Sequence, residues 1–391
     1  MPAILDVSLD DGCQPLVFNW GPSSFLGFGV YALNIALTLA TDPTVAPIFP
    51  TKWDRIVLDP IRAARLELVR PPSDALRNAL AEAGEAMVNV PVLHAMQDNL
   101  GRDETPWTGS PLFGVIFSVD THVVEESREL AKSYRRIITG CTWNEQILRA
   151  NGIDHVTTIL QGVDPGLFHP GPRSGYFNDS FVIFSGGKLE FRKAQDLVLA
   201  GFKAFRERHP EAILVTAWHS PWPELARSLI PPPPLTEAGV VDIGRWAADA
   251  GLPPGSVRDV GQVPNSYMPY ILREADVALF ANRAEPGTNL VAMEAIACGV
   301  PTILSANTGH LDILAMDAAI PLTRQDAIVY SECATEGWGE SDVDEIVEAL
   351  ESVWRDREAA RALGLRGSTA MHALSWDKQV RTLAATVKSF L

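Results

Sequence analysis

The 391-residue chain has few of the groups that build disulfide frameworks, zinc sites or membrane spans. It contains only four cysteines, Cys13, Cys141, Cys298 and Cys333, which are far apart and form no C-x-x-C pair. In a chain of this length, that pattern indicates reduced thiols rather than disulfides or a zinc site. No run of about 18 consecutive apolar residues occurs, so we expect no integral membrane segment.

Positive charge is also scarce. Lys and Arg total 32 against 48 Asp and Glu, which gives a formal net charge of −16. A surplus of carboxylates repels phosphate backbones and anionic headgroups, which argues against nucleic acid as a partner and against broad electrostatic attachment to membranes. The N-terminal "MPAILDVSLDDG" lacks the basic start and apolar core of a signal peptide. We expect a cytoplasmic protein, and peripheral attachment at the inner face of the membrane stays open.

Three familiar motifs of phosphate and metal sites are missing. There is no G-x-x-x-x-G-K-[ST] loop and no H-E-x-x-H. The G-x-G-x-x-G pattern fails because Ala32 occupies its last position after Gly27-Phe28-Gly29. A phosphate site would therefore need a different arrangement, and ligation of a metal by histidine is unsupported.

Strand-like runs alternate with helical stretches along the chain. "PLVFNW", "VNVPVLHAM", "LFGVIFSVD" and "RRIITGC" predict strands in the first half, and "SFVIFSGG", "AILVTAW", "DVALFA" and "PTILSA" predict strands in the second. Such alternation implies mainly parallel sheets covered by helices on both faces. We predict an α/β protein of two doubly wound, Rossmann-like domains facing a cleft, joined near residues 162–175. Ligands of such sheets bind at the carboxyl ends of strands.

The first candidate site lies in "LFANRAEPGTN", predicted to leave a strand, and "LVAMEAIACG", predicted to form a helix. Thr288 or Asn289 can cap the helix, and Gly287 lets the backbone approach a ligand closely. Unpaired N–H groups at a helix start near Leu290 attract phosphate. Glu294, roughly 6 Å further along the axis, can accept hydrogen bonds from both hydroxyls of a ribose. An ordinary cap with a solvent-facing glutamate is the alternative.

The second candidate is "FSGGKLEFRKAQDLV", in which Gly187 ends a predicted strand. Lys188, Arg192 and Lys193 follow within one tight loop of an otherwise acidic chain. Cations beside mobile backbone can neutralise a diphosphate leaving group. A solvated cluster of loop charges is the alternative.

Two further candidates are weaker motifs. Gly27 and Gly29 precede a predicted helix and offer another backbone cradle for an anion, with a tight turn as the alternative. His94 ends a predicted strand, from which its side chain would project into the cleft. A structural histidine is the alternative there, and His122 competes with it. Trp218 could stack on a base, although packing is the simpler interpretation.

Taken together, these motifs resemble the retaining, nucleotide-sugar-dependent glycosyltransferases of the GT-B fold, in the large family 4-like group (glycosyl transferases group 1). "GGKLEFRKAQDLVLAGF" is similar to the family's G-R-L-x-x-x-K-G-x-x-x-L-L-x-A-F signature. "EPGTNLVAMEAIACGVPTI" is similar to E-G-F-G-L-x-x-L-E-A-M-A-x-G-x-P-V-I. "ILQGVDPGLFHP" is similar to I-P-N-G-V-D-x-x-x-F-x-P at the crossing between domains.

The resemblance implies roles for particular residues. Lys188 and Lys193 take the places of the Arg and Lys that bind the donor diphosphate, and Glu294 that of the ribose-binding glutamate. Glu285 is the candidate contact of the transferred sugar, and His94 matches the histidine near that sugar. The resemblance assigns catalysis to these residues apart from Glu294. Donor binding is assigned to Gly27, Gly29, Gly187, Gly287, Thr288, Asn289, Leu290 and Glu294.

The resemblance also implies the domain plan. Residues 1–165 would form an acceptor-binding domain and residues 166–375 a nucleotide-sugar-binding domain. Residues 376–391 would return as a helix to the first domain. No metal or cofactor is expected, because the lysines supply the charge, and the donor is a nucleotide diphosphate sugar. The acceptor would be a glycan, a lipid-linked molecule or a protein.

The chain departs from the family pattern at three positions. The family's two glutamates have seven residues between them, whereas Glu285 and Glu294 have eight. Either Glu285 still reaches the sugar, or backbone groups of residues 287–290 do so. Ala194 replaces the usual glycine, and Lys188 replaces an arginine, which loses the planar two-pronged contact but keeps the charge.

The resemblance therefore implies a retaining glycosyltransferase, in which the acceptor hydroxyl attacks on the face from which the diphosphate leaves. Two alternatives stay open. One is a sugar-nucleotide epimerase on the same fold. The other is a catalytically silent protein that binds sugar nucleotides.

Overall fold

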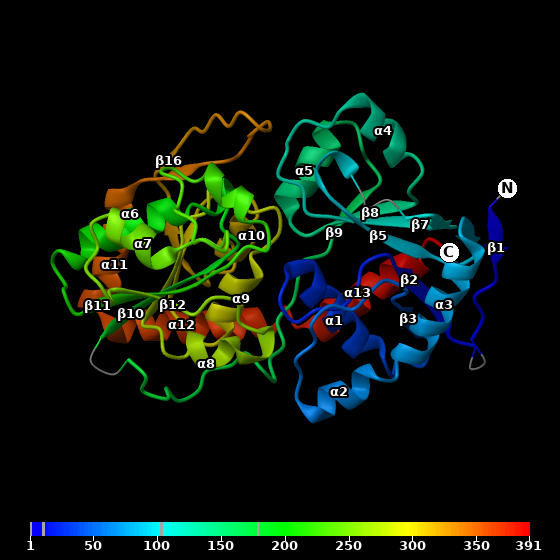
Figure 1. Cartoon of the computed structure of the whole chain (residues 1–391), viewed down its shortest axis with the longest axis horizontal. Helices are drawn as coiled ribbons and strands as arrows, with labels where there is room; N and C mark the ends of the chain where they lie inside the picture. Colours follow the sequence, from blue (N-terminus) through cyan, green and yellow to red (C-terminus); the bar gives the residue numbers. More distant parts are fainter. Residues whose placement is uncertain (1, 10–11, 102–104, 178–179) are drawn as a thin grey trace.

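Two α/β domains lie side by side in the computed structural model, which describes residues 2–9, 12–101, 105–177 and 180–391 (Figure 1). The first half of the chain builds one domain and most of the second half builds the other. The expected fold class, two Rossmann-like domains facing each other, is confirmed.

The first domain contains a six-stranded parallel sheet in the order β3-β2-β5-β7-β8-β9. Its strands are β2 (Gln14–Phe18), β3 (Val45–Ile48), β5 (Val92–Met96), β7 (Leu112–Ile116), β8 (Arg136–Thr139) and β9 (Val156–Thr158). A smaller parallel sheet consists of β1 (Ala3–Leu5), β4 (Ala86–Val88) and β6 (Trp107–Gly109).

The second domain contains a six-stranded parallel sheet in the order β12-β11-β10-β13-β14-β15. Its strands are β10 (Phe181–Gly187), β11 (Ala212–Trp218), β12 (Val257–Asp259), β13 (Val277–Phe280), β14 (Thr302–Ser305) and β15 (Ile320–Leu322). A short antiparallel pair, β16 (Gln325–Asp326) and β17 (Glu340–Ser341), follows it.

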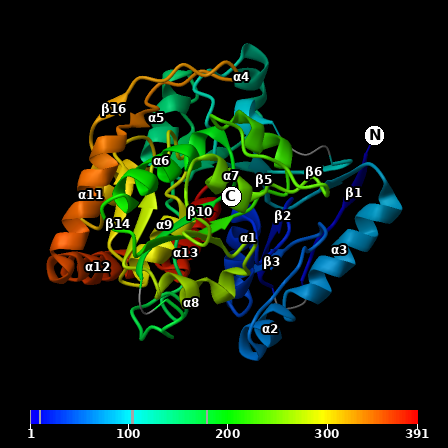
Figure 2. The same cartoon turned by 60° about the vertical axis from the view of Figure 1, so that its left-hand side comes forward.

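Helices cover both faces of the second sheet because its central strands carry buried apolar residues on both faces. In β10, Phe181 and Ile183 pack into the core beneath α6 (Gln195–Arg206) and α11 (Val343–Arg355). Val182 and Phe184 pack into the core beneath α9 (Leu290–Ala297). Alternate strand residues point to opposite faces, so a continuous apolar run indicates a sheet buried on both sides. Figure 2 shows α11 and α12 on the side away from the first domain.

The helices have the following bounds: α1 (Gly27–Leu39), α2 (Pro60–Leu66), α3 (Arg70–Ala83), α4 (Glu125–Ala131), α5 (Thr142–Ala150), α6 (Gln195–Arg206), α7 (Ile243–Asp249), α8 (Met268–Leu272), α9 (Leu290–Ala297), α10 (His310–Leu314), α11 (Val343–Arg355), α12 (Arg357–His372) and α13 (Trp376–Lys388). Within the described ranges, none of them is both long enough and apolar enough to cross a bilayer.

The chain crosses between the domains at two adjacent points. The backbone N–H of Val163 donates to the carbonyl of Leu374 at 3.0 Å, and Trp376 donates back to Val163 at 2.9 Å. An added Cβ at Gly162 would lie 2.7 Å from the Trp376 nitrogen, so this close approach requires glycine. Beyond the crossing, α13 packs on α1, with the Trp376 and Tyr31 rings stacked at 5.3 Å.

Each six-stranded sheet has one switch point in its strand order, and the two switch points lie at the cleft. In the second sheet, β10 and β13 are neighbours although two strands separate them in sequence, and in the first sheet β2 lies beside β5. At such a switch point, the following connections run to opposite sides and leave a crevice at the carboxyl ends. The loops after β2, β10 and β13 are therefore where this fold forms a site.

Candidate active site

A cavity of about 400 Å³ lies between the domains. Loops after β2, β10, β12 and β13 line it, together with the first turns of α9. Eight of the residues predicted for the site line this cavity: Gly27, Gly187, Lys188, Lys193, Glu285, Asn289, Leu290 and Glu294. The fold thus brings together motifs that are far apart in sequence.

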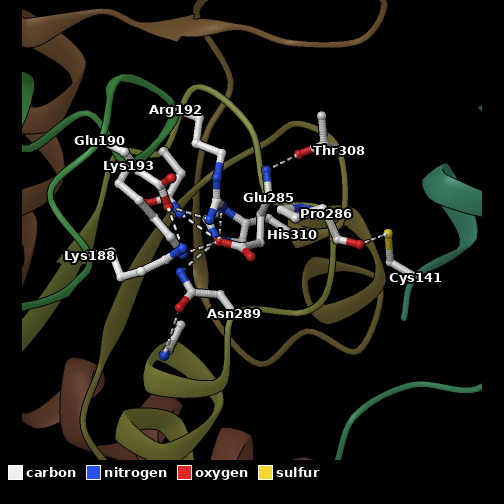
Figure 3. Close-up of polar contacts among 12 residues, drawn as sticks. Cys141, Lys188, Glu190, Arg192, Lys193, Glu285, Pro286, Asn289, Thr308 and His310 are labelled. Atoms are coloured by element: carbon white, nitrogen blue, oxygen red, sulfur yellow. Dashed lines mark hydrogen bonds and ion pairs between the residues drawn. The ribbon is translucent and has the colours of Figure 1, made fainter. Parts of the chain in front are cut away.

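A short 3₁₀ turn, Phe191–Lys193, carries two cations of the cavity, Arg192 and Lys193, and is called the cationic loop below. Lys193 Nζ forms an ion pair with Glu285 Oε2, and Arg192 Nη1 lies 3.7 Å from the same oxygen (Figure 3). Arg192 Nη2 pairs with Glu190 Oε1 at 2.5 Å. Because these side chains are almost fully buried, their charges interact with little solvent screening.

Glu285 is an ionised carboxylate. Burial alone would raise its pKa, but Lys193 and then Arg192 outweigh that effect and lower the pKa to about 2. Asn282 Nδ2 donates to Oε2 at 2.9 Å, and the Thr308 hydroxyl accepts from the Glu285 backbone N–H at 2.8 Å. These contacts fix the loop after β13 against the cationic loop.

Lys188 is the more accessible cation. Its Nζ lies 3.7 Å from Glu190 Oε1 and 5.3 Å from the centre of the Trp222 ring. Burial lowers its pKa despite the nearby carboxylates. Since the Lys188–Glu190 ion pair is longer than the Lys193–Glu285 pair and Lys188 lines the cavity, Lys188 can reorient toward an incoming anion.

Asn289 sets the start of α9. Its backbone adopts a left-handed conformation with φ of +61°, which asparagine tolerates better than most residues. Its Oδ1 accepts from the Ala292 N–H at 3.4 Å, and its Nδ2 lies 3.1 Å from His310 Nε2. His310 Nδ1 lies 3.2 Å from the Ser305 carbonyl, so Nδ1 carries the proton and Nε2 accepts. Burial lowers the pKa of His310 to about 4, which keeps it neutral.

Glu294 is buried on α9 beside the cavity. Burial raises its pKa to about 8, although Asn265 Nδ2 donates to Oε1 at 2.5 Å and opposes the shift. In the ligand-free protein it is therefore a neutral acid near pH 7. The hydroxyls of a bound ribose could replace the water that burial removes from Glu294, because they donate hydrogen bonds to carboxylate oxygens.

This raised pKa predicts how stability depends on pH. The folded protein keeps a proton on Glu294 that the unfolded chain releases above about pH 4.5, so the free energy of unfolding falls as pH rises toward 8. His310 acts in the opposite direction, but only below about pH 6.5. Between about pH 6.5 and about pH 8 we expect a loss of up to about 2 kcal/mol, measured by urea unfolding.

Glu294→Gln should remove most of that pH dependence, because the amide does not titrate. Glu82→Gln, at an exposed position, is the matched control and should keep the dependence. Equal slopes in Glu294→Gln and the wild type would contradict the prediction.

His94 is not part of the cavity lining among the described residues. It lies in the middle of β5, which continues to Met96, so the prediction that the strand ends at His94 is wrong. The side chain is buried, and Nδ1 lies 3.1 Å from the Tyr134 hydroxyl, with the two rings packed edge-on. The structure thus places His94 in the interior of the first domain and not on the cavity lining. The competing His122 is exposed on the surface.

Three predicted donor contacts lie behind the cavity surface. An added Cβ at Gly29 would meet Ser23 Cβ at 2.4 Å, so Gly29 lets the loop pack on its helix. An added Cβ at Gly287 would lie 2.9 Å from the Phe117 ring. The Thr288 hydroxyl lies 2.9 Å from Met293 Sδ and is fully buried. These residues shape the loops and are not among those lining the cavity.

Sequence patterns single out none of the following lining residues individually, although Trp222 and Asn265 lie in two stretches, 214–224 and 257–265, that could wall a base pocket. Asn265, which binds Glu294, comes from the loop after β12, and Phe25 and Phe117 come from the first domain. Trp222 lines the cavity, whereas Trp218 packs against Trp246 in the core, as its simpler interpretation predicted. Their only sequence signal is a position shortly after a strand.

The two domains touch on both sides of the cavity. On one side the Asn265 N–H donates to the Ser24 carbonyl at 2.7 Å. On the other, Cys141 Sγ lies 3.2 Å from the Pro286 carbonyl oxygen (Figure 3). The chain therefore adopts a closed arrangement. Within the described residues, no three His, Cys, Asp or Glu side chains are grouped so that they could hold a metal ion.

Comparisons with known proteins point to glycosyltransferases. Residues 268–383 match the model of a family described as family 4 glycosyltransferases in conflict systems. The chain is similar to D-inositol 3-phosphate glycosyltransferase 1 of Catenulispora acidiphila, at 25% identity over 282 residues. That alignment covers 68% of this chain and 60% of the relative.

Solved structures share the fold. Sucrose-phosphate synthase from Thermosynechococcus elongatus superposes with a TM-score of 0.63 at 18% identity, covering 96% of this chain and 98% of that one. The Anabaena protein HepE, solved in complex with UDP and glucose, superposes with a TM-score of 0.62 at 12% identity. The alignment with HepE covers 96% of this chain and 100% of HepE.

Proposed function

We propose that this chain, a GT-B protein similar to family 4 glycosyltransferases, moves a sugar from a nucleotide diphosphate sugar to an acceptor hydroxyl. One observation carries the proposal. Lys188, Lys193, Glu294 and the N-terminus of α9 all line the same cavity, at the switch point of the second sheet. A diphosphate attached to a ribose has the charge and the hydroxyls that these groups recognise.

The cations would stabilise the leaving diphosphate. Negative charge develops on its β-phosphate as the bond to the sugar breaks, and preorganised cations in a site shielded from water stabilise that charge strongly. Lys188 can approach the phosphate directly, and the backbone N–H groups that start α9 add the helix dipole. These groups supply the charge that a divalent cation supplies in other transferases, so we propose a metal-independent reaction.

Glu294 would bind the nucleoside. A bound ribose would donate to its carboxylate and favour ionisation, which lowers the raised pKa of Glu294 in the complex. Asn265 would hold one carboxylate oxygen in place. The neighbouring loop residues Gly261, Gln262 and Val263 line the cavity and can contact the base.

The reaction would retain the configuration of the sugar. Glu285 lines the cavity, and its Oε2 is held by Lys193, Arg192 and Asn282. It is therefore suited to orient the cations and to contact sugar hydroxyls rather than to form a covalent intermediate. We propose front-face attack by the acceptor, on the side from which the diphosphate departs, in a site closed to water.

A ligand screen followed by a transfer assay tests this function. UDP, GDP, ADP and dTDP are compared by thermal shift, because a ligand at about 100 times its Kd stabilises the folded state by about 2.7 kcal/mol. A nucleotide diphosphate sugar that contains the selected base and a labelled sugar is then supplied as the donor. Transfer or slow hydrolysis supports the proposal, an epimerised donor indicates an epimerase, and binding without turnover indicates a silent binding protein. Stabilisation by none of the four nucleotides would overturn the proposal.

A further inference from the structure

One segment of the second domain reaches across to the first domain. Residues 327–339, between β16 and β17, form an extended arm that we call the strap (Figure 1). β16 and β17 pair at its base. Figure 1 shows the strap, in orange, running from its base toward α5.

The strap is tied to the first domain by directed hydrogen bonds. The Trp338 indole N–H donates to the Val119 carbonyl at 3.1 Å, and the Trp143 indole N–H donates to the Glu336 carbonyl at 3.3 Å. The Thr121 N–H donates to the strap backbone at residue 334, at 3.2 Å. These contacts fix both the backbone and the one buried aromatic ring of the strap.

The strap is also tied to the cationic loop. The Tyr330 ring stacks on the Phe191 ring, with centroids 4.5 Å apart and planes 10° apart. The Trp338 ring stacks on Tyr330 in turn, at 6.1 Å and 25°. A continuous aromatic stack therefore runs from Trp338, which is hydrogen-bonded to the first domain, through Tyr330 to Phe191, which begins the cationic loop.

Arg283 and Ser228 also hold Phe191 in place. The Arg283 guanidinium carbon lies 4.2 Å from its ring centroid, which places it on the face that Tyr330 leaves open. The Phe191 N–H donates to the Ser228 hydroxyl at 2.9 Å, and its carbonyl accepts from Arg283 Nη1 at 2.9 Å. Arg192 and Lys193 follow directly, so the placement of Phe191 sets where their side chains begin.

We infer that the strap positions the cationic loop for the donor diphosphate and makes that positioning depend on contact between the domains. Tyr330 and Trp338 act as positioning residues, since they touch Phe191 or Val119 and are not among the described residues that line the cavity. When the domains separate, the stack loses its anchor and the cations lose their alignment. The inference rests on the proposed function for the identity of the ligand.

The test compares three variants in the full chain. Tyr330→Ala removes the stack on Phe191. Trp338→Phe keeps a ring over Tyr330 but removes the hydrogen bond to Val119, and it remains informative if Tyr330→Ala fails to fold. Val329→Ala is the matched control, because Val329 lies on the strap with its side chain 96% exposed.

Two readouts separate a positioning role from a merely structural one. The first is the affinity ratio of the nucleoside diphosphate over the nucleoside monophosphate of the same base, measured by calorimetry. We expect the ratio to fall about fivefold to tenfold in Tyr330→Ala and about twofold in Trp338→Phe. It should not change in Val329→Ala. The second is amide hydrogen exchange across residues 188–195 without nucleotide, which should accelerate in the same order.

Ratios and exchange rates in Tyr330→Ala equal to those of Val329→Ala would overturn the inference. Faster exchange with an unchanged ratio would also overturn it, because the loop would then be loosened without consequence for the diphosphate. A wild-type protein that binds no nucleoside diphosphate would instead refute the proposed function. In that case unchanged hydrogen exchange in Tyr330→Ala would still refute the tie between strap and loop, whereas accelerated exchange would uphold it.

Discussion

Lys193→Ala is expected to lower kcat/KM for sugar transfer by about 10²- to 10³-fold, the usual effect of removing one preorganised group that stabilises developing charge. Lys193 is nearly buried, lines the cavity and forms the tightest ion pair of the cationic loop. Initial rates with the selected donor give the value. Lys203→Ala, at an exposed position on α6, is the control and should leave kcat/KM unchanged.

Loss of folding must be separated from loss of chemistry in this variant. Removing Lys193 leaves Glu285 buried with a weaker partner, since Arg192 lies 3.7 Å away. We expect a cost of about 3 kcal/mol, the lower end for breaking a buried ion pair. In the double variant Lys193→Met, Glu285→Gln neither charge remains, so stability should recover while transfer stays low. Recovery of transfer in the double variant would make the role of Lys193 structural.

Arg283→Ala is expected to lower the free energy of unfolding by about 3–5 kcal/mol. Arg283 is almost fully buried, and its guanidinium holds Asp196 with two hydrogen bonds of 3.0 and 2.7 Å. It also pairs with Glu340 at the base of the strap, at 2.6 Å, and donates to the Phe191 carbonyl. The variant leaves the Asp196 carboxylate buried without its partner, and urea unfolding measures the loss.

Two other arginine variants sharpen the comparison. Arg245→Ala breaks an exposed pair with Asp249 at 3.8 Å and should cost less than about 1 kcal/mol. Arg283→Lys keeps the charge but not the two-pronged contact, so an intermediate loss is expected. A loss in Arg283→Ala no larger than in Arg245→Ala would contradict the prediction.

Most of the fold was predictable because parallel strands buried on both faces are short apolar runs. The helices α2 and α3 were not predicted. In α3 the first turn contains Pro71 and Pro72, which are acceptable where N–H groups have no helical partner but resemble breakers in sequence. The pattern at residues 88–96 predicts one strand, whereas residues 86–88 and 92–96 belong to different sheets.

The site was predictable where its signal is local. Lys188 and Lys193 stood out because basic residues are scarce and glycines precede them. Pairings across long separations left no such trace: Arg283 binds Asp196 across 87 residues, and Trp338 binds Val119 across 219. His94 lies inside its strand rather than at the end, because β5 runs two residues further than the pattern indicates.

The paired crossings near Val163 and Ser375 make the second domain, topologically, an insertion into the first. Its entry and exit are joined by two backbone hydrogen bonds, so both covalent links share one pivot. Motion of one domain against the other is thereby limited to swinging about that point. Such an insert could lengthen or shorten its surface loops over evolution without disturbing the sheet into which it is spliced.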